Sequence, residues 1–141
     1  MKRTLIVAGM ALALVFAGVS CNKYEEGSNF SLLSAKARLS NIWTQASSTY
    51  ETDVSSTPNT GFTEVAVTFT KDGTYTYTGK FISIPFAESG TWVFNSDKTV
   101  VTMTEASGDV ESWTLIKLKG KELKVTTPFS SGTLTFDFTG V

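Results

Sequence analysis

Histidine is absent from this chain of 141 residues, and Cys21 is its only cysteine. Catalytic systems in which histidine activates a serine or cysteine are therefore excluded. Zinc sites built on histidine or on several cysteines are excluded as well, and no disulfide can form within the chain. We accordingly expect no cofactor and no metal site, and a fold that depends on its apolar core.

An excess of basic residues is also missing. The chain has 12 lysines and arginines against 13 aspartates and glutamates. Removal of the predicted leader (residues 1–20) would take Lys2 and Arg3 away, which leaves ten basic residues and a net charge of −3. Nucleic-acid binding needs a basic patch, so we expect no nucleic-acid partner. Anionic membrane surfaces would not attract such a chain either.

A hydrophobic run long enough to span a membrane is the third absence. The apolar stretch from Leu5 to Ala17 falls several residues short of the roughly 20 that are needed. Lys2 and Arg3 precede this stretch and small residues follow it, which is the layout of a secretory signal peptide. We predict a lipoprotein signal peptide over residues 1–20, a lipidated tether over 21–30 and one domain over 31–141.

The end of this leader reads Gly18-Val19-Ser20-Cys21. It resembles a bacterial lipobox, in which the cysteine is lipidated and becomes the first residue after cleavage, although Gly18 stands where leucine is usual. The resemblance implies a diacylglyceryl group and an amide-linked acyl chain, such as palmitate, on Cys21. Two or more acyl chains anchor a protein stably in a membrane.

Two acidic residues, Glu25 and Glu26, follow the predicted lipidation site. They resemble the surface-export signal of Bacteroidota lipoproteins. That resemblance implies a lipid-anchored protein of the outer membrane, exposed at the cell surface. The alternative is that the two carboxylates only keep a short tether solvated.

A short helix is predicted at the start of the domain. Ser34 can cap a helix from Ala35 to Leu39, which is too short to be stable alone. We expect it to rest on the strands that follow, as a plug. Trp43 lies at the start of the first predicted strand, where we expect its indole to pack against this helix as a structural residue.

The segment from Ser47 to Gly61 is polar, with few apolar residues. It predicts a long loop, and loops of this length are usually functional or disordered. Two readings stay open: a lid over one end of the domain, or a simple connection.

The next segment predicts a hairpin whose register can be derived. Val67 and Phe69 alternate with polar residues, and Tyr75 and Tyr77 resume the alternation after a turn. A three-residue loop with Gly73 in the left-handed conformation pairs Phe69 with Tyr75 and Val67 with Tyr77. That register places all the large apolar side chains on one face, whereas a two-residue loop would separate them.

Further strands are predicted downstream, at residues 81–86, 90–94, 99–104, 111–118, 122–127 and 133–139. Eight or nine strands joined by hairpins favour an all-β fold, a single up-and-down antiparallel barrel of about eight strands. A β-sandwich is the alternative, although it usually needs longer crossover connections.

Four short patterns follow one another along the domain: Leu39-x-Asn41-x-Trp43, Thr68 to Tyr75, Gly90-Thr91-Trp92 and Trp113 to Leu118. Their order resembles the lipocalin-like lipoproteins of Bacteroidota. The resemblance implies a β-barrel fold and no established substrate. Lipocalins proper carry glycine where this chain has Asn41, so the chain is lipocalin-like rather than a member of the kernel family.

The side chains expected to line the barrel are Val67, Phe69, Tyr75, Tyr77, Ile116 and Phe136. They either enclose a ligand cavity with phenolic hydrogen-bonding groups or simply fill the core. Glu105, Asp109 and Glu111 gather around one hairpin, and grouped carboxylates can bind calcium or act as acid and base. Since no calcium-binding pattern surrounds them, we interpret them as a solvated turn.

Three functional hypotheses follow. The first is a non-enzymatic binding module, anchored to a membrane through Cys21, that captures a small apolar or amphipathic molecule. The second is an accessory or scaffold protein that binds another envelope protein through its loops. The third is an enzyme, which without histidine or a free thiol would rely on carboxylates, lysine or tyrosine. Fold alone does not decide between them.

Overall fold

The computed structural model describes residues 34–141. The predicted signal peptide, Cys21 and the tether lie outside the described residues. The described part begins with helix α1 (Ala35–Leu39), and strands follow it to the C-terminus. Among these residues, no helix has the length and apolar content that a membrane span requires.

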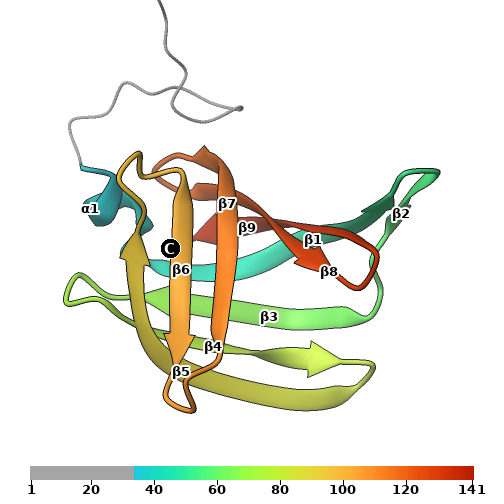
Figure 1. Cartoon of the computed structure of the whole chain (residues 1–141), viewed down its shortest axis with the longest axis horizontal. Helices are drawn as coiled ribbons and strands as arrows, with labels where there is room; N and C mark the ends of the chain where they lie inside the picture. Colours follow the sequence, from blue (N-terminus) through green and yellow to red (C-terminus); the bar gives the residue numbers. More distant parts are fainter. Residues whose placement is uncertain (1–33) are drawn as a thin grey trace, which may run out of the picture.

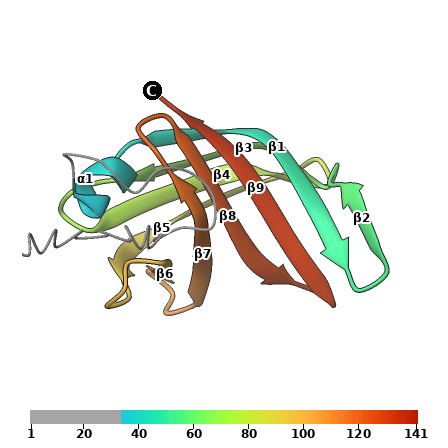
Figure 2. The same cartoon turned by 90° about the horizontal axis from the view of Figure 1, so that it is seen from above.

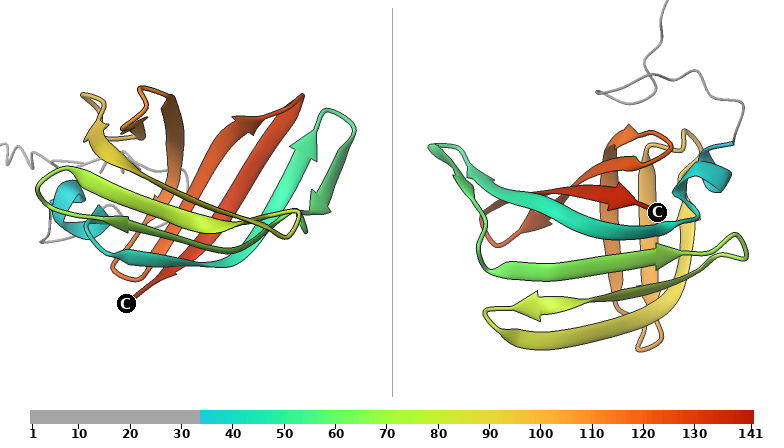
Figure 3. Two further views of the ribbon diagram at one scale, coloured as in Figure 1. Left: turned by 90° about the horizontal axis from the view of Figure 1, so that it is seen from below. Right: turned by 180° about the vertical axis from the view of Figure 1, so that it is seen from behind.

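The strands are β1 (Ile42–Thr52), β2 (Ser55–Pro58), β3 (Phe62–Phe69), β4 (Thr74–Phe81), β5 (Ile84–Phe94), β6 (Val100–Glu105), β7 (Val110–Leu118), β8 (Glu122–Phe129) and β9 (Gly132–Gly140). They form one antiparallel sheet in the order β2-β1-β3-β4-β5-β6-β7-β8-β9 (Figure 1). The sheet closes because β1 also pairs with β9. Figure 3 shows the strands curving around a common interior. The predicted barrel of eight strands is confirmed, with β2 as an additional strand outside the closed ring.

The β3–β4 hairpin has the register that turn chemistry predicted. Phe69 pairs with Tyr75 and Val67 pairs with Tyr77. Gly73 adopts a φ of +90°, a conformation that glycine tolerates because it has no Cβ atom. All four apolar partners are buried, so the residue pattern and the turn agree on one register.

The prediction of a long loop from Ser47 to Gly61 is wrong, because most of this segment forms strands. Strand β1 continues to Thr52, and β2 folds back on it with Thr52 opposite Ser55. Residues Ser47 to Glu51 pair with β9 on the other side. Serine and threonine can join such a ladder, but their polarity hides the strand from a reading based on apolar alternation.

The predicted strand over residues 81–86 is also corrected. A two-residue turn at Ile82 and Ser83 separates β4 from β5, with Phe81 opposite Ile84. Both turn residues have positive φ, 49° and 65° respectively. An isoleucine with a positive φ is unusual, so the residue types at this position did not predict a turn.

One end of the barrel is closed by α1. Ser34 caps the helix by accepting a hydrogen bond from the backbone of Ala37. The indole of Trp43 is fully buried and donates to the backbone oxygen of Leu39 over 2.8 Å. Arg38 reaches across to the end of β7 and donates to the oxygen of Leu118 over 2.8 Å. Trp43 thus packs where the sequence predicted, between the helix and the first strand. The β1–β2 hairpin lies at the opposite end (Figure 2).

Candidate functional site

A cavity of about 410 Å³ lies in the half of the barrel away from α1. Its lining residues are Phe62, Tyr77, Phe81, Phe86, Glu88, Glu111, Thr127, Pro128, Phe129, Leu134 and Phe136. Several of them stand at strand ends on this side: Phe62 begins β3, Phe81 ends β4 and Phe129 ends β8. The hairpins on this side therefore surround the opening of the cavity.

Five phenylalanines form the apolar wall of the cavity. Phe62 is central, with its ring centroid 4.7 Å from that of Phe81, 5.5 Å from Phe129, 5.7 Å from Phe136 and 6.2 Å from Phe86. Most of these pairs meet edge to face, the arrangement that aromatic rings prefer. The five rings come from five different strands, so only closure of the barrel brings them together.

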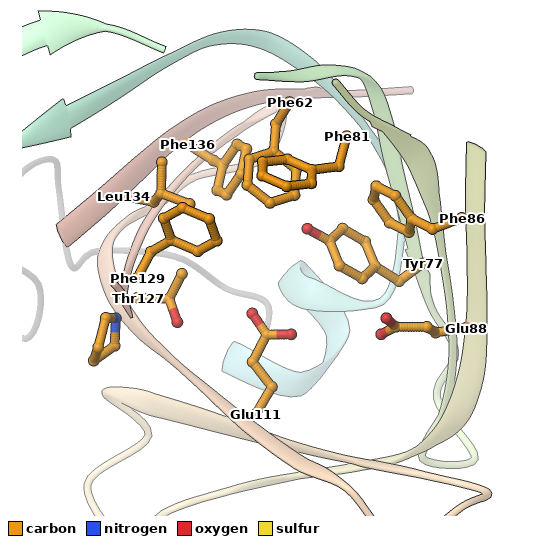
Figure 4. A pocket seen from close by; sticks show the side chains of 11 residues that line it. Phe62, Tyr77, Phe81, Phe86, Glu88, Glu111, Thr127, Phe129, Leu134 and Phe136 are labelled. Carbon is orange, nitrogen blue, oxygen red and sulfur yellow. The ribbon is translucent and has the colours of Figure 1, made fainter. Parts of the chain in front are cut away.

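Polar groups occupy the other side of the cavity. Figure 4 shows the carboxylates of Glu111 and Glu88 and the phenol oxygen of Tyr77 facing its interior. Glu111 accepts a hydrogen bond of 2.6 Å from the indole nitrogen of Trp113. The hydroxyl of Thr127 donates to a backbone oxygen of β7 over 3.2 Å. Strands β4, β5, β7 and β8 each contribute one polar side chain.

Burial shifts the pKa values of these groups. It raises the pKa of Glu111 above the ordinary carboxyl range. The pKa of Glu88 is raised by burial and then by the negative charges of Glu105, Glu111 and Asp109. The pKa of Tyr77 is raised by burial and then by Glu111 and Glu88. Each shift favours the uncharged form of its group, because the cavity is poorly solvated and carries negative charge only.

A smaller hollow of about 240 Å³ adjoins the cavity and shares Glu88 and Glu111 with it. Glu105 and Asp109 lie on its other wall. The interpretation of Glu105, Asp109 and Glu111 as a solvated turn is therefore corrected for Glu111, which is half-buried and faces the cavity. Within residues 34–141, no group of acidic, histidine or cysteine side chains is arranged to bind a metal ion.

The side chains predicted to line the barrel divide between its two halves. Tyr77 and Phe136 line the cavity. Val67 and Phe69 are buried near the closed end, where the ring of Phe69 packs edge to face on tryptophans. Tyr75 borders the smaller hollow. Both predicted alternatives, a filled core and a cavity, therefore occur in this barrel. The half near α1 is filled, and the other half is hollow.

The prediction for Ile116 is corrected. The β7–β8 register shifts between Leu115 and Lys117, so Ile116 has no partner on β8. Leu115 and Leu118 are buried instead, and Ile116 is only half-buried and does not line the cavity. An extra residue in one strand reverses the alternation beyond it, which a strictly alternating pattern does not reveal.

Most of the cavity's phenylalanines were missed from the sequence. Phe62 and Phe81 are paired across the β3–β4 ladder, and Phe86 and Phe129 also lie near strand ends. Aromatic residues beside predicted turns were the available signal, because hairpin ends on one side of a barrel share a rim. No comparable feature of the sequence indicated that Glu88 and Glu111 would line the cavity.

The family model of the lipocalin-like domain matches residues 39–125, from the last residue of α1 into β8. No curated protein shows significant similarity to the chain. The matched segment covers well over half of the sequence and contains most of the strands that form the barrel. The barrel itself is the fold that such a match leads one to expect. This chain belongs to the family of lipocalin-like domains.

Proposed function

We propose that this protein is a non-enzymatic binding module that captures a small apolar or amphipathic molecule in its barrel. The observation that supports the proposal is the cavity of about 410 Å³ with its wall of phenylalanines. Small-molecule sites are commonly cavities of roughly 300–1,000 Å³, lined mainly by apolar side chains with a few polar groups. A lipocalin-like barrel is suited to such a role.

We further propose that the module is held on the outer membrane by lipid on Cys21 and faces the cell surface. The support is the sequence: a positive, then apolar, then small-residue leader, the lipobox-like residues 18–21, and the acidic pair Glu25 and Glu26. An anchored binding module would hold its ligand at the membrane. The lipid also supplies the anchoring that the acidic domain surface does not.

One feature favours the alternative role as a scaffold for another envelope protein. Strand β2 is exposed along its whole length and pairs only with β1. The adjoining turn residue Val54 is 93% exposed. An edge strand can accept a strand from another chain, so the β1–β2 hairpin is the surface where such a partner would bind.

The binding proposal can be tested with the neutral apolar fluorophore N-phenyl-1-naphthylamine, whose emission rises in apolar surroundings. We expect saturable binding to the full chain after extraction in a mild non-ionic detergent and dilution of that detergent below its micellar concentration, so that no micelles take up the fluorophore. Phe129→Ala removes one ring from the cavity wall and should weaken binding about tenfold, which is about 1.4 kcal/mol.

Phe94→Ala provides the matched control. Phe94 is a partly buried phenylalanine like Phe129, but it packs on Trp92 and does not line the cavity. Its loss should leave the affinity for the fluorophore unchanged. Equal weakening by both substitutions would indicate a general loss of structure, and the absence of saturable binding would contradict the proposal.

A further inference from the structure

Charge and apolar surface are separated within the cavity. The phenylalanine rings lie together on one side and the carboxylates of Glu88 and Glu111 on the other (Figure 4). A ligand that fills such a space must offer an apolar body to one side and a polar head to the other. None of the described residues that line the cavity is a lysine or an arginine.

No ion pair within residues 34–141 compensates the negative charge of the cavity. The side chain of Glu88 makes no hydrogen bond or ion pair with any described residue. Glu111 has only the neutral indole of Trp113 as a partner among residues 34–141. Glu105 and Asp109 stand close enough to raise the pKa of Glu88 through their charges. Carboxylates held in an apolar site without a counter-charge are costly, so a positive ligand would be stabilised there.

The aromatic wall favours the same sign of charge. The faces of aromatic rings are electronegative and attract ammonium groups, an interaction worth about 0.5–2 kcal/mol. The phenol ring of Tyr77 and the ring of Phe86 stand near Glu88, with their centroids 5.0 Å apart. A cationic head group between the carboxylates and these rings would interact favourably with both. An anionic head group would be repelled by both.

From these observations we propose that the cavity selects cationic amphiphiles: molecules with a protonated amine or quaternary ammonium head and an apolar alkyl or aromatic body. The head would pair with Glu88 and Glu111, and the body would lie against the phenylalanines. This inference rests on the proposed function, and it names the ligand class. A fatty acid of the same length would be a poor ligand, because its carboxylate would face two others.

The release of protons on binding is a second property expected of a cationic ligand. The titratable groups that share a hollow with Glu111 are Tyr75, Tyr77, Glu88, Glu105 and Asp109. None of these groups carries a positive charge. A bound cation favours the ionised carboxylates and lowers their raised pKa values. Binding should therefore release protons, and affinity should increase as the pH rises through the range where these carboxyls ionise.

The test compares three ligands that share one alkyl chain: decylammonium, decanol and decanoate. Each competes with N-phenyl-1-naphthylamine for the full chain at pH 7.5. We expect decylammonium to bind at least tenfold more tightly than decanoate, with decanol between them. Titration calorimetry in two buffers of different ionisation enthalpy should show proton release for decylammonium.

Three charge variants identify the groups responsible. Glu88→Gln and Glu111→Gln should each reduce the preference for decylammonium over decanoate by at least threefold. Glu88→Gln is the safer variant, since the side chain of Glu88 makes no hydrogen bond within the described residues. Glu122→Gln changes the net charge equally, but Glu122 lies outside the cavity, at the start of β8, beside Lys117 and Lys119. It should leave the preference unchanged.

The outcomes separate the two proposals. Equal or tighter binding of decanoate, or an unchanged preference in Glu88→Gln, overturns the inference about charge and leaves the binding module intact. If the fluorophore and all three ligands fail to bind, the proposed function itself is wrong, and the inference fails with it.

Discussion

The indole nitrogen of Trp113 donates a hydrogen bond to the carboxylate of Glu111, with 2.6 Å between Nε1 and Oε1. Trp113 is fully buried, and its ring stacks on that of Phe138 with centroids 5.8 Å apart. The two residues are two positions apart on β7, so both face the barrel interior. The polar side of the cavity is thereby attached to the filled half of the core.

The first prediction concerns Glu111 and pH. Its pKa is raised in the folded protein above the ordinary value of 4.5, so the folded state holds the proton more tightly than the unfolded chain. The free energy of unfolding should then fall as the pH rises from about 4.5 through the raised pKa. In Glu111→Gln this fall should be smaller, while the amide oxygen still accepts from Trp113. Urea unfolding, followed by tryptophan fluorescence at several pH values between 4 and 8, measures this pH dependence of the free energy of unfolding.

Glu88 shifts in the same direction, so the single variant should flatten the profile without abolishing its slope. Glu122→Gln, outside the cavity, serves as the control. An identical pH profile for Glu111→Gln and the unmodified protein would show that Glu111 does not titrate as the structure implies.

A second prediction concerns the contact between Gly140 and Trp43. A Cβ atom at Gly140 would lie 2.9 Å from the indole ring of Trp43 and 2.6 Å from the side-chain nitrogen of Asn41. Gly140→Ala should therefore destabilise the protein by about 1–3 kcal/mol. Gly120→Ala is the control, because a Cβ there meets nothing within 4 Å. Chemical denaturation measures the free energy of unfolding of both variants. Equal values for the two variants would contradict the prediction.

The β4–β5 turn provides a third prediction. Ile82 and Ser83 both have positive φ, the requirement of a type I′ turn, for which Asn-Gly is preferred. Replacing the pair by Asn-Gly should stabilise the protein by about 1 kcal/mol, which raises Tm by roughly 4–8 °C in a domain of this size. Thermal unfolding followed by circular dichroism gives Tm.

Ile84→Asn is the matched control for that variant. Ile84 is 69% exposed and Ile82 is 68% exposed, but Ile84 lies in strand β5. If relief of the turn is the cause, only the Asn-Gly variant should gain stability. A similar gain in Ile84→Asn would mean that loss of an exposed apolar side chain was responsible.

The fourth prediction concerns the anchor. Cys21→Ser should abolish metabolic labelling with an alkyne analogue of palmitate and should move the protein from the membrane fraction to the soluble fraction. Ser20→Ala, one residue earlier, keeps the cysteine and should keep the label. Labelling that persists in Cys21→Ser would place the lipid on another residue, and a lack of labelling in the unmodified protein would contradict the lipid anchor. Protease accessibility on intact cells tests surface exposure separately.

Some of the fold could be read from the sequence because the information is local. Ser34 before a short run of helix formers predicted α1, and the turn at Gly73 with the flanking alternation predicted the register of β3 and β4. The succession of hairpins predicted the barrel. In each case, neighbouring residues carried both the signal and the structure.

Other elements were hidden because their partners are distant. The polar residues of β1 beyond Ser47 form a strand because β9, some 90 residues later, supplies a ladder for them. The bulge at Ile116 exists only relative to its neighbour β8. Such pairings are decided by the closure of the sheet, which no local pattern encodes.

The sequence by itself determined the absence of histidine and disulfide chemistry, the alternation of the strands and the residues available for a core. Only the tertiary structure decided that half of the barrel is filled and half is hollow. Five phenylalanines and two carboxylates line the cavity, and they come from β3, β4, β5, β7, β8 and β9. Their convergence depends on how six strands tilt around one axis, and on where each strand ends.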